Sequence, residues 1–261
     1  MAKVIAVANQ KGGCSKTSVV ANLGIGLARE GKKVCVIDAD PQGSLTASLG
    51  YQEPDEIGLT LATIMMNIIG DDDYEPDGEI LHHQEGIDLV PANIELSGLE
   101  VSLGNTMSRE MILKIYVEQL RDRYDYILID CMPSLGVMTI NALVAADRVL
   151  IPVQAAYLPI KGLQQLIKTV GVVKKRLNKN LTIEGILITM VDYRTNYAKD
   201  ITAMLKESYG DIVGIFDCYI PFSVKVAEAS AQGCSIYKYA PKSKAAESFE
   251  ALTREVLNYG K

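Results

Sequence analysis

Near the start of the chain, a glycine-rich loop joins an apolar run to a helical pattern. Residues 4–8 are all apolar, residues 9–18 read NQKGGCSKTS, and residues 19–28 repeat apolar residues at helical spacing. This order predicts a strand, a loop and a helix, an arrangement in which backbone N–H groups and a helix N-terminus cradle phosphates. Lys16 would neutralise β/γ-phosphate charge, and the Thr17 hydroxyl would ligate Mg²⁺.

The loop departs from the usual phosphate-loop pattern G-x-x-x-x-G-K-[ST]. Gln10 stands at the first glycine position of that pattern and Ser15 at the second, and the sequence follows K-G-G-x-x-K-[ST] instead, with an additional lysine at Lys11. In this loop the chain resembles the deviant P-loop of the ParA/MinD group of ATPases. Over essentially its whole length it is similar to the short, Soj-like branch of ParA.

Two acidic motifs follow apolar runs that predict buried strands. The sequence D-A-D-P-Q-G occupies residues 38–43, and residues 126–129 end at Asp130 in the Walker B form. Open α/β sheets bind ligands beyond the carboxyl ends of their strands, so these carboxylates are expected beside the glycine loop. Aspartates there could hold Mg²⁺-bound water or orient an attacking water. By resemblance to the ParA family, Asp40 positions the hydrolytic water and Asp38 supports the Mg²⁺ site.

The resemblance also implies a two-subunit site that binds ATP and Mg²⁺. In the family the additional lysine crosses a dimer interface, so that two ATP molecules are held between two P-loops. The residues expected to act in catalysis are Lys11, Lys16 and Asp40. The expected nucleotide contacts are Lys11, Gly12, Gly13, Cys14, Ser15, Lys16, Thr17 and Ser18 in the loop, with Thr189, Met190, Pro221 and Phe222 near the adenine, and the expected metal residues are Thr17, Asp38 and Asp130.

Ser15 is the departure from the family pattern with the clearest consequence. The usual ParA loop has glycine at this position, beside the γ-phosphate and the facing subunit. A side chain there crowds the backbone if the loop requires a positive φ, and it could equally place a hydroxyl near phosphate. We expect nucleotide binding to be retained, and dimer closure and hydrolysis to be the steps that Ser15 affects.

Charge is distributed unevenly along the chain. The formal net charge is −6, with 11 Lys and Arg against 22 Asp and Glu in residues 1–160 and 15 against 10 in residues 161–261. A basic C-terminal part can offer a local nucleic-acid surface even when the whole chain is acidic.

The Soj-like family binds DNA without sequence preference through basic residues of this C-terminal part. Arg194 matches one such position, Lys225 replaces a second arginine, and Lys242 and Lys244 keep a basic pair near the last helix. Phe222 stands where another arginine often lies. Because phosphate contacts require charge more than fixed geometry, we expect DNA binding that is weaker than in relatives.

Alternating strand and helix patterns without repeats predict one α/β domain over residues 1–261, a doubly wound and mostly parallel sheet flanked by helices. We expect no membrane segment, because no apolar stretch reaches the length of a bilayer, and no signal peptide, because the N-terminus lacks the basic start and the cleavage site of one. Five scattered cysteines without a C-x-x-C pair predict reduced thiols and a cytoplasmic protein, and the resemblance to the ParA family implies association with the nucleoid. The last helix, residues 243–259, is expected to dock by its apolar face.

These features favour a slow partition ATPase of the ParA type. It would act as an ATP-bound homodimer on DNA, stimulated by a ParB-like partner through a positively charged segment. Two alternatives remain open. A MinD-like membrane-positioning ATPase is disfavoured by the absence of a basic amphipathic tail. The other alternative is a nucleotide-binding regulator in which Ser15 has abolished turnover.

Overall fold

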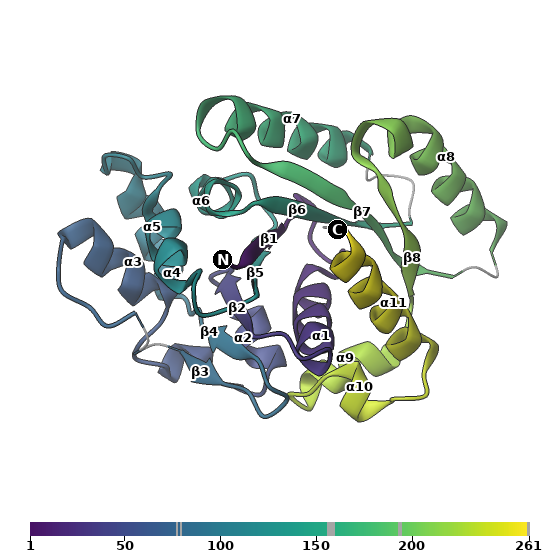
Figure 1. The fold of residues 1–261 in the computed structure, drawn as a ribbon, viewed down its shortest axis with the longest axis horizontal. Helices are drawn as coiled ribbons and strands as arrows, with labels where there is room; N and C mark the ends of the chain where they lie inside the picture. The colour runs from purple at the N-terminus through teal and green to yellow at the C-terminus, as the bar shows by residue number, and fades with distance from the viewer. Residues whose placement is uncertain (77, 79, 156–159, 193–194, 260–261) are drawn as a thin grey trace.

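A sheet of eight strands runs through the middle of the structure, with helices on both faces (Figure 1). The computed structural model describes residues 1–76, 78, 80–155, 160–192 and 195–259. The strands are β1 (Lys3–Val7), β2 (Val34–Ala39), β3 (Leu81–His82), β4 (Asp88–Val90), β5 (Tyr126–Cys131), β6 (Arg148–Gln154), β7 (Thr182–Val191) and β8 (Ile215–Pro221). Their order across the sheet is β3-β4-β2-β5-β1-β6-β7-β8, and only the β3–β4 pair is antiparallel. The predicted doubly wound, mostly parallel sheet is confirmed.

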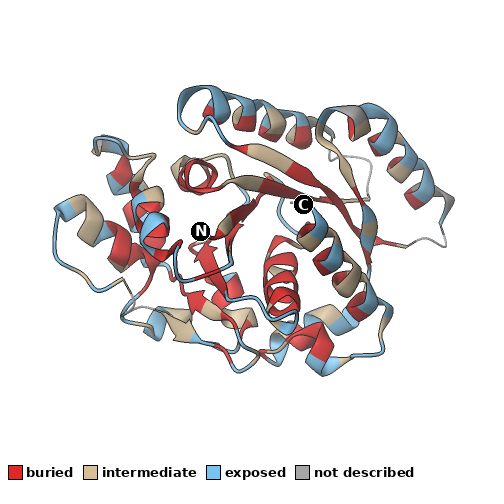
Figure 2. Ribbon diagram, in the orientation of Figure 1, coloured by how far each residue is buried: buried red, intermediate tan, exposed pale blue. Residues whose placement is uncertain are grey.

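The helices form two layers. They are α1 (Lys16–Arg29), α2 (Ser44–Ser48), α3 (Leu61–Gly70), α4 (Glu95–Ser102), α5 (Ile112–Leu120), α6 (Val137–Ala145), α7 (Ile160–Arg176), α8 (Asn196–Val213), α9 (Val224–Ala231), α10 (Ile236–Tyr239) and α11 (Lys244–Asn258), with short 3₁₀ turns η1 (Pro54–Glu56) and η2 (Leu103–Asn105). Helices α3, α4, α5, α6, α7 and α8 form one apolar core with one face of the sheet. Helices α1, α2, α10 and α11 form a second apolar core with the opposite face. The inner sides of these helices are buried and their outer sides are exposed (Figure 2).

Burial from both sides explains the composition of the central strands. Every residue of β2 is buried, and β5 is buried from its second residue onward. Parallel strands covered on both faces are nearly continuously apolar, because neither face meets water. Against that background the aspartates Asp38 and Asp130, which end the apolar runs of β2 and β5, are the exceptions.

The central position of β1 sets the place of the site. β1 pairs with β5 on one side and with β6 on the other, so that Val7 lies opposite Asp130 and opposite Leu150. The chain leaves β1 through α1 towards β2, whereas β6 and its successors lie on the other side. Connections that diverge in this way leave a crevice at the carboxyl ends of the strands, which is where open α/β sheets bind ligands.

The structure corrects the sequence prediction in a few elements. Apolar residues at helical spacing predict a helix over residues 107–123, but α5 begins only at Ile112, after turns in which Ser108 has a φ of 53°, a left-handed conformation that an α-helix excludes. α2, α10 and the antiparallel strand β3 were not predicted, because elements of 5, 4 and 2 residues are too short to show a period.

The last helix docks as expected. Ala245, Phe249, Leu252 and Val256 of α11 are all buried. Among the described residues, no helix is both long and apolar enough to cross a bilayer.

The loops that follow α2 and α9 pack tightly on each other through two glycines. Gly50 and Gly233 both have a positive φ, of 99° and 63°. A Cβ placed on Gly233 would lie 2.4 Å from the Cα of Gly50, a distance that neither backbone can accommodate without moving. Glycine is therefore required at this contact for both conformation and space.

We expect Gly233→Ala to lower the free energy of unfolding by roughly 2–4 kcal/mol, from backbone strain and overpacking together. The matched control is Gly171→Ala in α7, where an added Cβ meets nothing within 4 Å. There the lost chain entropy of glycine should raise stability by about 0.5–1 kcal/mol. Urea unfolding of both variants measures the difference, and equal effects would contradict the packing argument.

Candidate active site

The glycine-rich loop follows β1 and turns into α1 as the sequence predicted. Gly13 and Ser15 have φ values of 71° and 70°, on either side of the buried Cys14. α1 begins at Lys16, which is itself buried, and its first turn carries no acidic residue. The unsatisfied N–H groups of this helix start, together with the loop amides, form the kind of concavity that binds phosphate.

Bonds to the Lys11 carbonyl hold the loop from within. The Cys14 thiol donates to the Lys11 carbonyl oxygen at 3.2 Å, and the Lys16 ammonium donates to the same oxygen at 3.3 Å. Burial raises the pKa of the Cys14 thiol, so this group stays a neutral packing element. On the far side of the loop, the Thr189 hydroxyl donates to the Cys14 carbonyl at 3.1 Å. The loop is thereby fixed to the end of β7.

Asp130 and Thr17 meet at the mouth of the loop. The Thr17 hydroxyl donates to Asp130 Oδ2 at 2.7 Å. Asp130 Oδ1 is buried and has no hydrogen-bond partner within the described residues. A buried carboxylate oxygen without a donor is costly, so this atom is suited to a cation or to a water that a cation holds.

Asp38 lies beside Asp130 but faces a different set of partners. The two aspartates are register partners on β2 and β5. Asp38 Oδ2 accepts the backbone N–H and the hydroxyl of Thr46 at 2.9 and 2.8 Å, and Oδ1 accepts the N–H of Asp40 at 3.2 Å. The Thr46 hydroxyl also accepts the Ala92 N–H at 3.1 Å. Asp38 thus anchors α2, and the metal role assigned to it from the sequence stays a prediction.

Burial disfavours the ionised form of both Asp38 and Asp130. Burial raises the pKa of Asp38 to about 7, against the lowering effect of its bonds from Thr46. Burial, and then the neighbouring Asp38 charge, raise the pKa of Asp130 well above its usual value, although Thr17 and Lys16 oppose this. Two adjacent carboxylates in a dry site hold a proton until a cation replaces it.

Asp40 lies in the loop between β2 and α2 and is partly exposed. Its Oδ1 accepts the N–H of Gln42 at 3.0 Å, and its carbonyl accepts the N–H of Gly43 at 3.0 Å. Gly43 has a φ of 58°, and a Cβ there would lie 2.8 Å from Pro54 and 2.9 Å from the Ala92 carbonyl. The loop that carries Asp40 is therefore fixed from below by η1 and by the segment after β4.

Lys11 points away from the loop that it begins. Its side chain is exposed, and its ammonium donates to Gln154 Oε1 at 3.4 Å, at the end of β6. The loop itself is held to β6 by Asn9, whose amide donates to the Pro152 carbonyl at 2.6 Å. The roles of Gln154, Asn9 and Thr46 were not predicted, because a single polar residue in a strand end, a loop or a short helix has no signature until its neighbours are known.

The residues predicted near the adenine come together at the ends of β7 and β8. Val191 pairs with Pro221, and the Phe222 N–H donates to the Val191 carbonyl at 3.1 Å. Met190 has a φ of 54°, and Phe222 is 64% exposed. These residues lie next to the loop through the bond from Thr189 to Cys14. Their contact with a base stays a prediction.

The residues predicted to bind DNA are placed in part. Arg194 lies outside the described residues. Lys225 at the start of α9, and Lys242 and Lys244 at the start of α11, are exposed, and none of the three forms an ion pair within the parts of the chain that are described. α10 lies between α9 and α11 in the chain, and the Tyr239 hydroxyl donates to Glu228 of α9 at 3.0 Å.

Comparison with known proteins assigns the family. A family model described as an AAA domain matches residues 2–183. The chain is 43% identical over 260 residues to the sporulation initiation inhibitor protein Soj of Bacillus subtilis, with 100% of both chains covered. It is 38% identical to the chromosome partitioning protein ParA of Caulobacter vibrioides, over 98% of this chain and 94% of that one. The chain belongs to the ParA/Soj family of partition ATPases.

Solved structures agree with the ParA/Soj assignment. A cobyrinic acid a,c-diamide synthase from Mycobacterium smegmatis, crystallised with an ATP analogue and magnesium, superposes with a TM-score of 0.86 at 34% identity, covering 99% of this chain and 96% of that one. The septum site-determining protein MinD from Pyrococcus horikoshii, in complex with Mg-ADP, gives a TM-score of 0.75 at 25% identity, covering 98% and 96%.

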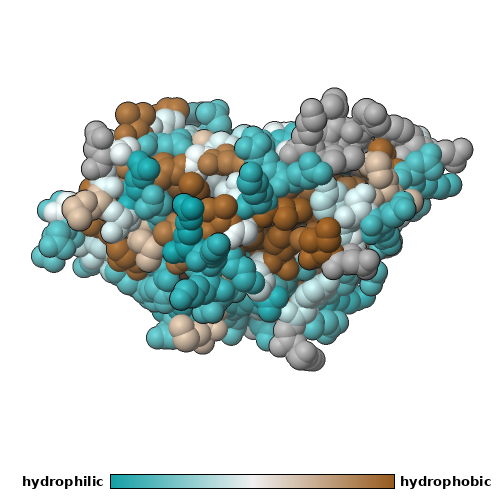
Figure 3. All heavy atoms as spheres, turned by 90° about the horizontal axis from the view of Figure 1, so that it is seen from above, coloured by the Kyte–Doolittle hydropathy of each residue, from teal (hydrophilic) through white to brown (hydrophobic). Residues whose placement is uncertain are grey.

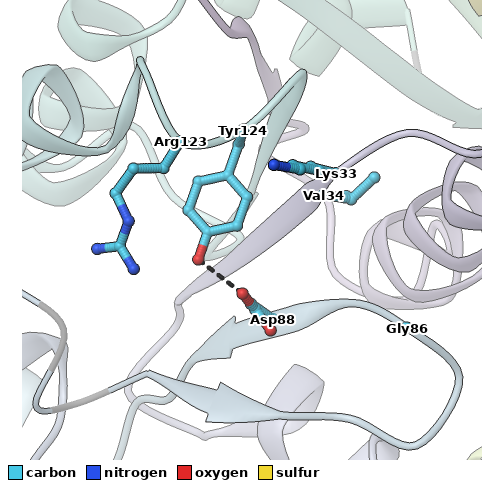
Figure 4. Close-up of a pocket in the computed structure, with 6 residues that line it drawn as sticks. All are labelled: Lys33, Val34, Gly86, Asp88, Arg123 and Tyr124. Carbon is cyan, nitrogen blue, oxygen red and sulfur yellow. Dashed lines mark hydrogen bonds between the residues drawn. The ribbon is translucent and has the colours of Figure 1, made fainter.

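Other hollows of this ParA/Soj member lie away from the phosphate loop. A polar pocket of about 210 Å³ is lined by Lys33, Val34, Gly86, Asp88, Arg123 and Tyr124 (Figure 4). The Tyr124 hydroxyl donates to Asp88 Oδ2 at 2.7 Å. These residues precede or begin β2, β4 and β5, whereas Asp38 and Asp130 lie near the other ends of β2 and β5. The pocket is therefore at the amino ends of the strands, opposite the phosphate loop.

The surface that carries α7 has apolar patches between hydrophilic side chains (Figure 3). A hollow of about 390 Å³ between α7 and α8 is lined by apolar residues that include Ile167, Ile183 and Ile212, together with Lys174. Like the polar pocket, this hollow contains none of the residues predicted for the nucleotide.

The backbone strain at Ser15 predicts the effect of replacing it. A left-handed residue with a Cβ costs about 1–2 kcal/mol, while glycine costs about 0.5–1 kcal/mol of chain entropy. Strain relief therefore wins, and Ser15→Gly should stabilise the nucleotide-free protein by about 0.5–1 kcal/mol in urea unfolding. Ser18→Gly, in the first turn of α1, is the control and should destabilise.

We expect Ser15→Gly also to change ATP-dependent dimerisation or ATP turnover, measured by light scattering and phosphate release. Unchanged dimerisation and turnover would show that Ser15 does not limit closure of the site.

The raised pKa values predict how metal binding depends on pH. A carboxyl with a raised pKa keeps its proton up to about pH 7, and Mg²⁺ must displace that proton. Mg²⁺-dependent ATP affinity should therefore weaken as the pH falls from about 8 to about 6, by up to about tenfold per unit for one displaced proton. Calorimetry with Asp130→Asn is the control, because protonation of ATP itself is the same in both titrations. Equal pH profiles would contradict the prediction.

Proposed function

We propose that this ParA/Soj member is a Mg²⁺-dependent ATPase that acts as a nucleotide-controlled DNA-partition switch. The observation that carries the proposal is the pairing of the Thr17 hydroxyl with Asp130 at the end of a phosphate loop, where Asp130 Oδ1 is buried without a donor. A phosphate loop supplies the anion site, and the oxygen pair beside it supplies the cation site that phosphoryl transfer requires.

The residues at the loop fit Mg²⁺. Hydroxyl and carboxylate oxygens are its preferred ligands, and Thr17 and Asp130 would hold it, with Asp38 behind them. When bound, Mg²⁺ neutralises charge on the phosphate oxygens of ATP. Its double charge also offsets the cost of ionising two buried carboxyls, which is the reason that the site suits a metal–nucleotide complex better than an anion alone.

Phosphoryl transfer also requires a phosphate site, a fixed positive charge and an oriented water, and side chains and amides of this chain supply them. The loop amides and the start of α1 bind phosphate, and Lys16 adds a fixed positive charge beside it. Asp40, on the loop between β2 and α2, accepts a hydrogen bond from the attacking water and orients it. Its partial exposure leaves room for that water. Because Asp40 is held by a turn and by Gly43, its position depends on the packing of η1 below it.

Lys11 supports a site completed by a second copy of the chain. Its ammonium lies at the exposed end of β6, near Gln154, and contacts none of the metal residues. A lysine in that position can reach the nucleotide of a facing subunit, so that ATP joins the two. Hydrolysis would then release the dimer, because the contacts to the γ-phosphate are lost.

The ATP dimer is expected to bind DNA without sequence preference through exposed lysines. Lys225, Lys242 and Lys244 supply charge for phosphate contacts. Pairing two copies would double the number of such contacts, which makes binding dependent on ATP. A DNA-bound, ParB-like partner would then stimulate turnover.

The proposal is tested by measuring ATP turnover and DNA retention with and without Mg²⁺-ATP, on wild type and Asp40→Ala. The variant should bind ATP, lose turnover roughly 100-fold or more, and stay on DNA longer, because the dimer is not released. Wild-type DNA affinity should fall steeply with salt and require ATP. DNA retention that is equal with and without nucleotide would contradict the switch.

Two lysine variants test whether Lys11 acts in dimerisation and not in ATP binding. Lys11→Ala should retain ATP but lose ATP-dependent dimers, whereas Lys32→Ala, at an exposed lysine beyond the opposite end of α1, should behave as wild type. ATP binding with no turnover, with or without DNA, would instead support the nucleotide-binding regulator.

A further inference from the structure

Helix α4 exposes an apolar stripe to solvent. Ile94, Gly98 and Val101 are spaced i, i+4 and i+7, which places them on one side of the helix. Ile94 is 53% exposed and Val101 80% exposed, and a Cβ on Gly98 would meet nothing within 4 Å. Leu96 and Leu99, on the opposite side, are buried in the core shared with α3. α3, α4 and α5 lie together at one end of the molecule (Figure 1).

The residues beside the start of this stripe are acidic, whereas its other end is followed by η2, where the Arg109 guanidinium donates to the Gly104 carbonyl at 2.8 Å. The sequence contains no Lys or Arg between Lys33 and Arg109. Glu53 and Glu56 of the η1 segment and Glu95 of α4 are exposed, and none of these carboxylates forms an ion pair within the described residues. We call Ile94, Gly98 and Val101, with Glu53, Glu56 and Glu95, the α4 face.

η1 and α4 are joined at this surface. Asp55 Oδ1 of η1 accepts the N–H of Ile94 at 3.0 Å, and the Asn93 side chain donates to the Ile57 carbonyl at 3.5 Å. The acidic residues of η1 are therefore held beside the start of the apolar stripe. A ligand that covers the stripe would meet negative charge along its edge.

The α4 face is connected to both catalytic loops. Glu100 of α4 lies against Gly136, where a Cβ would come within 2.5 Å of Glu100 Oε1. Gly136 ends the loop that follows Asp130 and precedes the first residue of α6. On the other side, η1 and the segment before α4 contact Gly43, through Pro54 and the Ala92 carbonyl, in the loop that carries Asp40. A displacement of η1 would therefore act on the loop of Asp40, and a displacement of α4 on the loop that follows Asp130.

We propose that the α4 face docks a basic amphipathic helix of a partner protein. Apolar side chains on that helix, at the same spacing, cover Ile94 and Val101, and Gly98 allows the two helices to approach closely. Lys and Arg at the edges of the partner helix meet Glu53, Glu56 and Glu95, which speeds association and selects against acidic partners. DNA is disfavoured here, because its phosphates would be repelled by the same carboxylates.

Docking at this face is positioned to change ATP turnover. A partner that covers α4 and η1 would contact both elements that pack against the loops of Asp40 and Asp130. This consequence rests on the proposed function, whereas binding at the α4 face does not. The structure thus separates a docking step, read by affinity, from a regulatory step, read by turnover.

The test uses a fluorescent, synthetic 20-residue peptide with leucines at helical spacing and lysine or arginine elsewhere. Two further peptides replace its basic residues by Glu or scramble its order. Anisotropy with the full chain and Mg²⁺-ATP should show binding of the basic amphipathic peptide alone. The double variant Val101→Ser with Glu95→Lys should weaken that binding by roughly tenfold or more, since both an apolar anchor and an edge charge are lost.

The matched control carries the same kinds of change on α8, where Ile212 is 69% exposed and Glu207 is also exposed. Ile212→Ser with Glu207→Lys should bind the peptide as wild type does. The proposal is overturned if the wild type does not bind the basic peptide, if both double variants lose the same affinity, or if the scrambled peptide binds equally well.

Three further readouts separate the docking proposal from other roles of the same surface. The α4 variant should keep wild-type ATP affinity, ATP-dependent dimerisation and DNA retention. Loss of dimerisation would make the face an interface between copies of the chain, and loss of DNA retention would make it a DNA contact; either result overturns the proposal. If the wild type does not hydrolyse ATP, the proposed function fails, while anisotropy still decides the docking step.

Discussion

Two buried carboxylates on neighbouring strands impose the main electrostatic constraint on this fold. Asp38 and Asp130 are register partners of β2 and β5, and both are almost fully buried. Neither could be kept there without compensation, because the charged form of a buried acid is strongly disfavoured. Thr46 satisfies Asp38, and Thr17 satisfies one oxygen of Asp130. The second oxygen of Asp130 has no hydrogen-bond partner within the described residues, and packing alone does not explain why it is buried. A metal–nucleotide complex would supply that partner.

The same constraint links the site to distant parts of the chain. Through Thr46, Asp38 holds α2 and the backbone of Ala92, and the loop after α2 packs on Gly233 near the end of α9. Lys225, a proposed DNA contact, lies on that helix. The carboxylate pair is therefore joined by a continuous series of contacts to elements that reach both the α4 face and the proposed DNA surface.

Strain is concentrated where the phosphate loop meets β7. Ser15 and Met190 are two of the four described residues other than glycine with a positive φ, and the Thr189 hydroxyl ties the two segments together. Conformations of this kind cost of order 1–3 kcal/mol each and persist where the surroundings enforce them. The loop already has its strained conformation before a ligand binds, so less conformational entropy is lost on binding. The geometry of the loop is also sensitive to the residue at position 15.

The sequence alone determined the fold class and the position of the glycine-rich loop between β1 and α1. Apolar runs that end in Asp38 and Asp130, and a glycine loop that ends in Lys16, predict where strands stop and where ligands bind, because these signals are local. Only the tertiary structure decided which partners each group has. It placed Asp38 on Thr46, turned Lys11 towards Gln154, and brought η1 and α4 against the loops that follow β2 and β5. Such contacts join residues far apart in the chain, and their geometry exists only after the sheet has ordered its strands.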